Sequence, residues 1–285
     1  MSWFTRDKRS RLSVAWEFTA KGTIWRLLPS PEGKIIIEDR DTVRKEVSFT
    51  CLDLATGRAW WNDVQHTERW WITIDSVQRG VLFLHEYASP DMPDHKKIIA
   101  IDLHSGETIW TNDELKLLFS HETSVYASQD GYEERRFYEL DLSTGAMKGE
   151  IDARYLSVLR ETVAKNSVDQ MQFASPFAGP QSDGIHGQSV ASATAKAGDV
   201  SLVECLDVGR KHVLAYYEDM KGVSAQASLR QHLCVLDGES HRLIFRDILN
   251  DQAMVAVPET FFAVGSFVYY IKNKTVLRAL NLSEN

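Results

Sequence analysis

The chain has 285 residues, of which 44% are hydrophobic and 25% charged, a globular composition that excludes a wholly disordered chain. Its formal net charge is −8, so its surface repels phosphate backbones and nucleic acid is not expected as a partner. The three cysteines stand far apart, and their spacing indicates neither a disulfide framework nor a zinc site.

The first residues carry no apolar stretch of the kind that follows the charges of an export signal. No run in the chain approaches the roughly 20 apolar residues that cross a bilayer. We therefore expect a cytoplasmic, monomeric protein with reduced thiols and no membrane span. Four basic residues near the start are interpreted as a solvated tail: Arg6, Lys8, Arg9 and Arg11.

The elements predicted along the chain are strands, and helical periodicity is hard to find. Several of the strand-like runs are continuously apolar, which is typical of sheets covered on both faces. In chain order the runs lie at 12–18, 34–38, 47–52, 81–85, 97–101, 266–271 and 276–280.

A short pattern repeats along the chain. Residues 52–61 and 101–110 both read aliphatic, Asp, Leu, then a Gly, with Trp four residues after that Gly. Weaker copies lie at 140–145, 236–245 and 280–285. The Asp side chain can bond backbone N–H groups and the Gly can take a positive φ, so each copy predicts a tight turn followed by a strand that buries its aromatic residue.

A second spacing links each turn to the next unit. A large apolar residue follows the aromatic residue after nine positions, as Trp70 follows Trp61. Each unit is therefore predicted to be a four-stranded antiparallel meander, a propeller blade. Five tryptophans are assigned to the core by these spacings: Trp16, Trp25, Trp61, Trp70 and Trp110.

The number of blades depends on the long interval between Asp141 and Asp237, which is close to two repeat lengths. Six blades are favoured, with five blades plus an insertion as the alternative. We expect a single domain, 1–285, whose ring is closed by strand 12–18 pairing with strand 276–282. The predicted blades are 24–62, 69–112, 116–152, an irregular 154–199, 200–248, and 251–285 completed by 12–18.

The pattern in residues 52–61 and 101–110 resembles the repeat of the quinoprotein (PQQ)-dehydrogenase-like β-propellers. The chain is similar to a distant bacterial member of that superfamily without an assigned function. The resemblance implies a propeller in which the motif docks neighbouring blades and marks no active site. Because the chain lacks the adjacent cysteine pair and the export signal of the quinone enzymes, no quinone or other cofactor is expected.

Candidate binding residues are those that the repeat leaves unexplained. Trp60 and Trp71 are the doublet partners of core tryptophans, and each is either a buried inter-blade residue or part of an aromatic platform for a sugar or peptide. Asp91, Asp94 and His95 lie in the proline-containing segment 85–95. That composition is compatible with a metal site, but an exposed polar loop is favoured, so no metal is predicted.

No catalytic motif is found. The favoured function is a non-catalytic binding or scaffold propeller, whose ligand meets the face opposite the Asp turns. The loops expected on that face are 39–46, 62–69, 87–97, 111–115, 130–135 and 219–228. The alternative is a small-molecule enzyme, a hydrolase or lyase, with scattered ionisable groups converging at the channel mouth.

Overall fold

A computed structural model describes residues 12–89, 92–132, 134–166, 171–177, 179, 184–220 and 228–283. The chain divides into two compact units, which are described separately. The continuous unit comprises residues 20–169, and the discontinuous unit comprises residues 1–19 and 170–285. The expectation of one domain over 1–285 stays a prediction.

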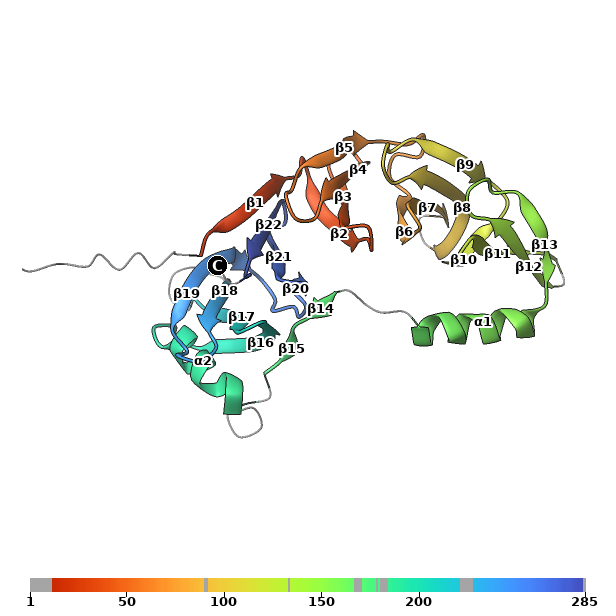
Figure 1. Ribbon diagram of the computed structural model, residues 1–285. Coiled ribbons are helices and arrows are strands. Elements are labelled where there is room, and N and C mark those ends of the chain that lie inside the picture. The colour runs from red at the N-terminus through yellow and green to blue at the C-terminus, as the bar shows by residue number, and fades with distance from the viewer. Residues whose placement is uncertain are drawn as a thin grey trace, which may run out of the picture. The chain divides into compact units, whose positions relative to one another are not determined.

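The continuous unit contains three four-stranded antiparallel sheets, each formed by strands that follow one another along the chain (Figure 1). The first blade consists of β2 (Thr23–Pro29), β3 (Lys34–Asp41), β4 (Glu46–Asp53) and β5 (Ala59–Val64). The second consists of β6 (Ile72–Gln78), β7 (Val81–Ser89), β8 (Met92–Asp102) and β9 (Thr108–Asn112). The third consists of β10 (Lys116–His121), β11 (Ser124–Asp130), β12 (Arg135–Asp141) and β13 (Met147–Ile151), and helix α1 (Ala153–Asn166) follows it.

The discontinuous unit contains two five-stranded sheets and helix α2 (Gly184–Thr194). The first sheet consists of β15 (Ser175–Pro176), β16 (Val200–Val208), β17 (Lys211–Asp219), β18 (Leu229–Asp237) and β19 (Leu243–Ala253). The second consists of β14 (Gln172–Phe173), β20 (Phe261–Val264), β21 (Phe267–Lys272), β22 (Val276–Asn281) and β1 (Val14–Thr19). The all-β class with four-stranded antiparallel blades is confirmed.

The predicted pairing of the two ends of the chain is also confirmed. Strand β1 runs antiparallel to β22, with Trp16 opposite Ala279 and Thr19 opposite Val276. An ion pair between Glu17 and Arg278 spans the same two strands, with 2.9 Å between Oε2 and Nη2. The N-terminal strand is therefore the fourth strand of the C-terminal blade.

The favoured count of six blades is wrong, because the described residues form five sheets. The segment 154–199, expected as a decayed blade, contains most of α1, the two short strands β14 and β15, and α2. The sequence pattern, in which helical periodicity is hard to find, did not indicate these two helices. A spacing close to two repeats cannot distinguish a decayed blade from an insertion of similar length. The alternative prediction, five blades plus an insertion, agrees with the part of the chain that the structure describes.

The repeated turns form as the sequence predicts. Asp53 Oδ1 accepts the backbone N–H of Thr56 at 2.8 Å, and Gly57 takes a φ of 69°. The turn glycines of the second and third copies also take positive φ. In the fourth copy His241 stands at the glycine position with a φ of 52°. The first four turns therefore keep a positive φ at this position, including the fourth, where the glycine is lost.

Burial agrees with the core assignment for Trp16 and Trp61, which are 9% and 8% exposed. Trp25 was also expected in the core, and that expectation is wrong, since its side chain is 62% exposed. The pairing of β2 with β3 shifts register between Ile24 and Arg26, so Trp25 is the extra residue of a β-bulge and turns outward.

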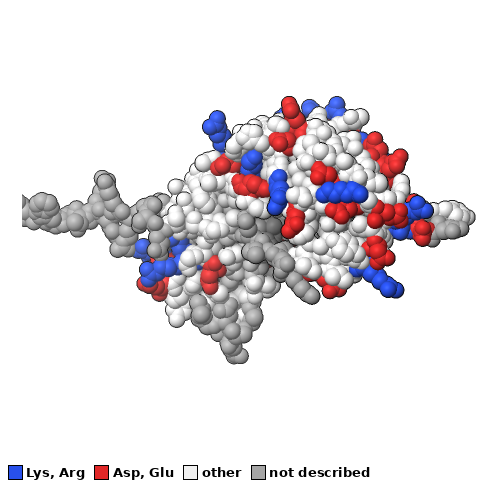
Figure 2. Space-filling view, turned by 45° about the vertical axis from the view of Figure 1, so that its right-hand side comes forward, with Lys and Arg blue, Asp and Glu red and all other residues white. Residues whose placement is uncertain are grey.

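The surface carries mixed charge. In the view of Figure 2, acidic and basic side chains are interspersed and do not gather into one patch of a single sign. Among the described residues, no helix has both the length and the apolar character needed to cross a membrane.

Candidate functional site

The connections of the continuous unit fall on two opposite sides of its blades. We call the side with the Asp turns the turn side, and the opposite side, which carries segments 39–46, 62–71, 87–97 and 130–135, the loop side. The loop side was predicted from connectivity to carry the ligand. Three polar hollows of the continuous unit lie along these connections and strand ends, lined by residues within 21–65, 129–136 and 134–153.

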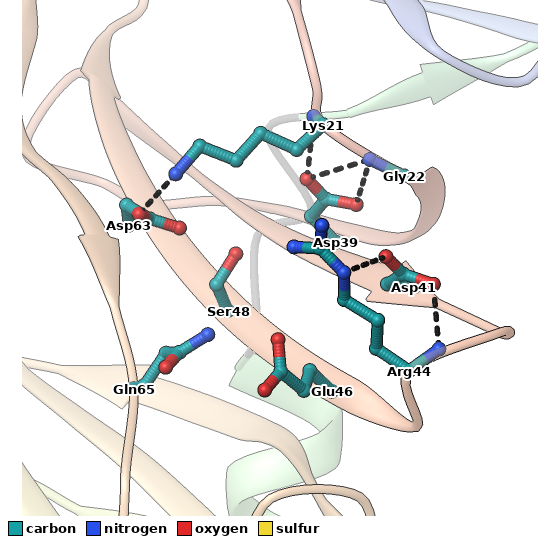
Figure 3. A pocket seen from close by; sticks show the side chains of 9 residues that line it. All are labelled: Lys21, Gly22, Asp39, Asp41, Arg44, Glu46, Ser48, Asp63 and Gln65. Carbon is teal, nitrogen blue, oxygen red and sulfur yellow. Dashed lines mark hydrogen bonds and ion pairs between the residues drawn. The ribbon is translucent and has the colours of Figure 1, made fainter.

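The hollow of the first blade is the most enclosed of these and has a volume of about 120 Å³. Four carboxylates and two basic side chains line it, together with Gly22, Ser48 and Gln65 (Figure 3). The charged residues are Lys21, Asp39, Asp41, Arg44, Glu46 and Asp63. We call this cavity the carboxylate hollow.

Strand β3 supplies the floor of the carboxylate hollow through its alternation. Asp39 and Asp41 face the hollow, while Glu38 and Arg40 point to the opposite face and are buried. Arg40 Nε donates to Glu38 Oε1 at 2.7 Å, and its guanidinium also donates to the carbonyl of Ile72 at the start of β6. This buried ion pair joins the first two blades. Glu38 and Arg40 therefore have a structural role, and of the charged run 38–41 only Asp39 and Asp41 face the hollow.

The carboxylates of the hollow are held by backbone donors and by cations. Asp39 accepts the N–H groups of Lys21 and Gly22 at 2.8 and 2.9 Å. Burial nevertheless raises the pKa of Asp39. The Lys21 ammonium pairs with Asp63, whose φ of 59° is unusual for a residue other than glycine. Gly22 is required here, because a Cβ would lie 2.4 Å from the carbonyl oxygen of Arg40.

Aromatic side chains gather around Arg40, on the face of the first blade opposite the carboxylate hollow. The Arg40 guanidinium lies 5.3 Å from the ring centre of Trp25 and 5.1 Å from that of Trp70. The Trp70 ring meets that of Trp71 edge to face, with ring centres 6.4 Å apart. Trp71, a predicted candidate, is 36% exposed. These rings therefore lie on the Arg40 face of the first blade and do not line the carboxylate hollow.

Trp60, the other tryptophan candidate, lies elsewhere. It is 45% exposed and packs on the turn side against Lys34 Nζ, 4.3 Å from its ring centre. The His104 ring lies 4.5 Å away, centre to centre. Trp60 therefore lies on the turn side, whereas Trp71 directly precedes β6 on the loop side, so the two do not form one platform.

The remaining candidate residues are Asp91, Asp94 and His95, and those that the structure describes do not form one site with Trp60. Asp91 lies outside the described residues. Asp94 accepts Lys116 Nζ at 2.7 Å, and the carboxylates of Asp94 and Asp130 raise the pKa of Lys116. His95 stacks on His85 with 3.5 Å between ring centres. The structure thus brings neither Asp94 nor His95 together with Trp60. It stacks His95 on His85, which was considered from the sequence only as part of the segment 85–95.

His85 and Asp75 were not singled out by the sequence. The Nδ1 atom of His85 lies 3.1 Å from Asp75 Oδ2, and the His85 side chain is 3% exposed. Its buried Nε2 has no hydrogen-bond partner among the described residues. Asp75 is the extra residue of a bulge between β6 and β7, and an Asp directly after the β-branched run 72–74 is the signal that could have indicated it.

This group brings three ligand-type atoms of Asp75, His85 and His95 within 4.8 Å of one another. The two imidazole planes are nearly parallel, at 18°. Lone pairs of ring nitrogens lie in the ring plane, so one metal ion cannot meet both without ring rotation. Burial and the neighbouring His85 lower the pKa of His95, which favours a neutral ring.

The comparisons with known proteins do not indicate a specific function. Residues 29–110 match a family described as Domain of unknown function (DUF4905). That segment runs from β3 into β9, so it covers most of the first two blades but not β2, and it includes most residues of the carboxylate hollow. The search of the curated proteins gives no match.

Among solved structures, the uncharacterized protein lmo1340 from Listeria monocytogenes EGD-e has 10% identity and a TM-score of 0.34, with 90% of this chain and 94% of that one covered. The β-propeller domain of the Trilobed protease from Pyrococcus furiosus has 9% identity and a TM-score of 0.32, with 94% and 70% covered. The endo-arabinase from Bacteroides thetaiotaomicron has 8% identity and a TM-score of 0.27, with 94% and 95% covered. TM-scores this low carry no argument about function.

Proposed function

We propose that this chain is a non-catalytic binding or scaffold protein, and that a partner protein meets the loop side of the continuous unit with a basic side chain in the carboxylate hollow. The observation that carries the proposal is the hollow's lining of four carboxylates against two basic groups. An excess of carboxylates favours an ammonium or guanidinium group over an anion.

The size of the hollow supports a side chain and not a whole metabolite. A volume of about 120 Å³ corresponds to about four water molecules, at roughly 30 Å³ each. Pockets for drug-sized ligands have volumes of about 300–1,000 Å³. The end of a Lys or Arg side chain fits this space, while the rest of the partner would lie on the surrounding surface.

Exposed tryptophans of the same unit suit a protein interface. Trp25 and Trp71 are exposed outside the hollow, 62% and 36% respectively. Tryptophan is enriched among the residues that dominate binding energy at protein interfaces. In such a contact the hollow would provide specificity by accepting one charged side chain, and the exposed rings would add buried area.

The test measures binding of a fluorescein-labelled hexalysine peptide to the full chain by fluorescence anisotropy. The variant Asp41→Asn/Asp63→Asn removes two charges from the hollow, and we expect affinity to fall about tenfold, the effect of losing one or two charge-assisted hydrogen bonds. The control Glu107→Gln/Glu122→Gln removes the same charge from the turn side and should leave the affinity within about twofold.

Equal losses in the two variants would show that the peptide senses only net charge, and the proposal would fail. Stronger binding of hexaglutamate than of hexalysine would also overturn it. Binding of hexalysine that is retained in the control and lost in Asp41→Asn/Asp63→Asn supports it.

One observation favours the alternative of a small-molecule hydrolase or lyase. Asp75, His85 and His95 converge on the loop side of the second blade. General acid–base catalysis uses such groups when a substrate can reach them. Turnover of a panel of ester and glycoside substrates that disappears in His95→Gln would support an enzyme, and turnover equal in both proteins would exclude a role for this group.

A further inference from the structure

Helix α2, in the segment that the repeat does not explain, lies against the sheet β15–β19 of the discontinuous unit (Figure 1). Its apolar residues Val190 and Ala193 pack against the sheet's core, and the Tyr216 hydroxyl donates to the Ala193 carbonyl at 3.4 Å. His186 and Ser189 precede them on the same helix. The helix is therefore anchored by its C-terminal half, with His186 and Ser189 held over the sheet's turn side.

His186 meets two residues of the β16–β17 hairpin. Its Nε2 lies 2.9 Å from Asp207 Oδ1, and the Nε2 of His212 lies 3.7 Å from the same oxygen. One ligand-type atom from each of the three residues lies within 4.8 Å of the others. The two imidazole rings are inclined at 75°, with centres 5.1 Å apart.

These distances fit a tetrahedral metal ion. Zinc binds imidazole nitrogen and carboxylate oxygen at about 2.0–2.2 Å, so two ligands of a tetrahedral site lie about 3.3–3.5 Å apart. The two measured separations, 2.9 and 3.7 Å, lie on either side of that value. Rings that are inclined to each other can direct both lone pairs to one point, which the stacked rings of His85 and His95 cannot do.

A buried hydroxyl orients the ring of His212. Ser189 is 0% exposed, and its Oγ lies 2.7 Å from His212 Nδ1 and 2.9 Å from His241 Nδ1. A hydroxyl has one proton, so it can donate to one of these nitrogens and must accept from the other. When His212 Nδ1–H donates to Ser189 and Ser189 donates to His241, the ring's lone pair lies on Nε2, the nitrogen nearer Asp207.

Such an oxygen partner on the second nitrogen is the usual support of a metal-binding histidine. The fourth repeat also departs from the others beside this ring. Gly238 stands where the other copies have leucine, and a Cβ there would come 3.3 Å from His212 Nε2. His241 replaces the turn glycine of the same copy. The two departures from the repeat thus lie next to His212.

We propose that His186, Asp207 and His212 bind a divalent transition-metal ion, with zinc as the first candidate, and that Ser189 and His241 position the His212 ring. The Asp207 side chain is 52% exposed, so the site opens to solvent. Three protein ligands leave a fourth tetrahedral position for water or an incoming ligand, as in exchangeable zinc sites. Bound metal would tie α2 to the β16–β17 hairpin.

The test uses the full chain, treated with a chelator and titrated with Zn²⁺ by calorimetry. We expect one ion per chain and a higher melting temperature with zinc than without it. Co²⁺ provides a second readout, because a tetrahedral cobalt site absorbs visible light more strongly than hydrated cobalt. Asp207→Asn and His186→Gln should each lower the affinity about tenfold or more, and Ser189→Ala should lower it by about 10- to 100-fold.

His95→Gln is the matched control, since it removes a histidine from the Asp75–His85–His95 group of the other unit. It should leave zinc affinity and stoichiometry unchanged. Circular dichroism of the metal-free variants checks that each is folded, and His186→Gln provides the test if Asp207→Asn does not fold.

The proposal is overturned if the wild-type chain binds no zinc, or if His186→Gln binds it as tightly as wild type. It is also overturned if binding is lost in His95→Gln and kept in His186→Gln, which would place the ion in the continuous unit. In each of these cases the His186–Asp207–His212 cluster would serve only to hold α2 by hydrogen bonds.

Discussion

The indole N–H of Trp61 donates to the carbonyl oxygen of Leu103 at 3.1 Å, so the last strand of the first blade is fixed to the Asp turn of the second. The same ring covers Gly106, the glycine of that turn, where a Cβ would lie 2.8 Å from Trp61 Cγ. Trp110 makes the equivalent bond to Leu142 at 2.9 Å. The aromatic residue and the turn glycine of the repeat are therefore the two halves of one contact between consecutive blades.

This contact predicts that Trp110→Ala destabilises the chain far more than Trp60→Ala. Trp110 loses its bond to Leu142 and its packing on the third blade, whereas Trp60 is 45% exposed and rests on Lys34 and His104. Truncating a well-packed tryptophan costs about 3–5 kcal/mol. Urea unfolding midpoints of the two variants provide the measurement, and equal shifts would contradict the docking role.

The glycine half of the contact can be tested separately. Gly106→Ala places a methyl group against the Trp61 ring, in addition to the strain of a φ of 77°. Gly80→Ala provides the control, because Gly80 has a φ of 74° and no atom within 4 Å of an added Cβ. Backbone strain alone costs about 1–2 kcal/mol in such a position.

We expect Gly106→Ala to lower the free energy of unfolding by at least about 1 kcal/mol more than Gly80→Ala, since overpacking adds a cost of this order. Gly106 and Gly80 have nearly the same φ, but only an added Cβ at Gly106 would contact another residue. The difference in unfolding free energy between the two variants therefore measures the packing against Trp61. If the two variants unfold at the same urea concentration, the ring moves aside freely and the contact is not tight.

The sequence predicted what depends on short-range chemistry. The bond from Asp53 to Thr56 and the positive φ of Gly57 follow from residues within one turn, so the pattern indicated them directly. The exposure of Trp25 was not predictable in the same way. A spacing of nine residues does not reveal a bulge, and the bulge at Trp25 reverses the side to which the ring points.

The candidate sites were harder to predict, because they depend on contacts between distant segments. Asp207 and His186 are brought together by a helix in a segment that the repeat suggested was a blade. Lys21 and Asp63 meet across two strands of the first blade, and neither stands in a motif. The loop side was predicted because connectivity alone decides which ends of the strands carry which segments.

Acid should weaken the fold through partly buried histidines. Burial lowers the pKa of His66 below its ordinary 6.5, and its ring lies edge-on to Phe49 at 6.0 Å. The unfolded chain therefore takes up this proton more readily than the folded chain. The contribution is fully present above pH 6.5 and is lost as the pH falls from there toward the lowered pKa of the folded state.

We expect the melting temperature to fall between pH 7 and pH 5, and His66→Phe to reduce that fall. His121, a surface histidine of the third blade, provides the control through His121→Gln, which should leave the pH dependence as in wild type. A slope unchanged in His66→Phe would show that this ring does not titrate with unfolding.

Removing residues 1–19 should destabilise the chain much more than removing residues 1–11. The longer deletion takes away β1, so β22 loses the partner that pairs with it from Val276 to Leu280. It also removes Trp16, whose ring packs against Tyr269 with 5.9 Å between centres. The edge of β22 would then be unpaired, which promotes association between chains.

The shorter deletion keeps β1 and serves as the control. We expect the 1–19 deletion to lower the melting temperature by much more than the about 2–4 °C that corresponds to 1 kcal/mol in a domain of this size. Size-exclusion chromatography should show association at concentrations where the control stays monomeric. If the deleted chain remains monomeric and melts within about 2 °C of the control, the β1–β22 pairing contributes little to stability, and the N-terminal strand is not an essential part of its blade.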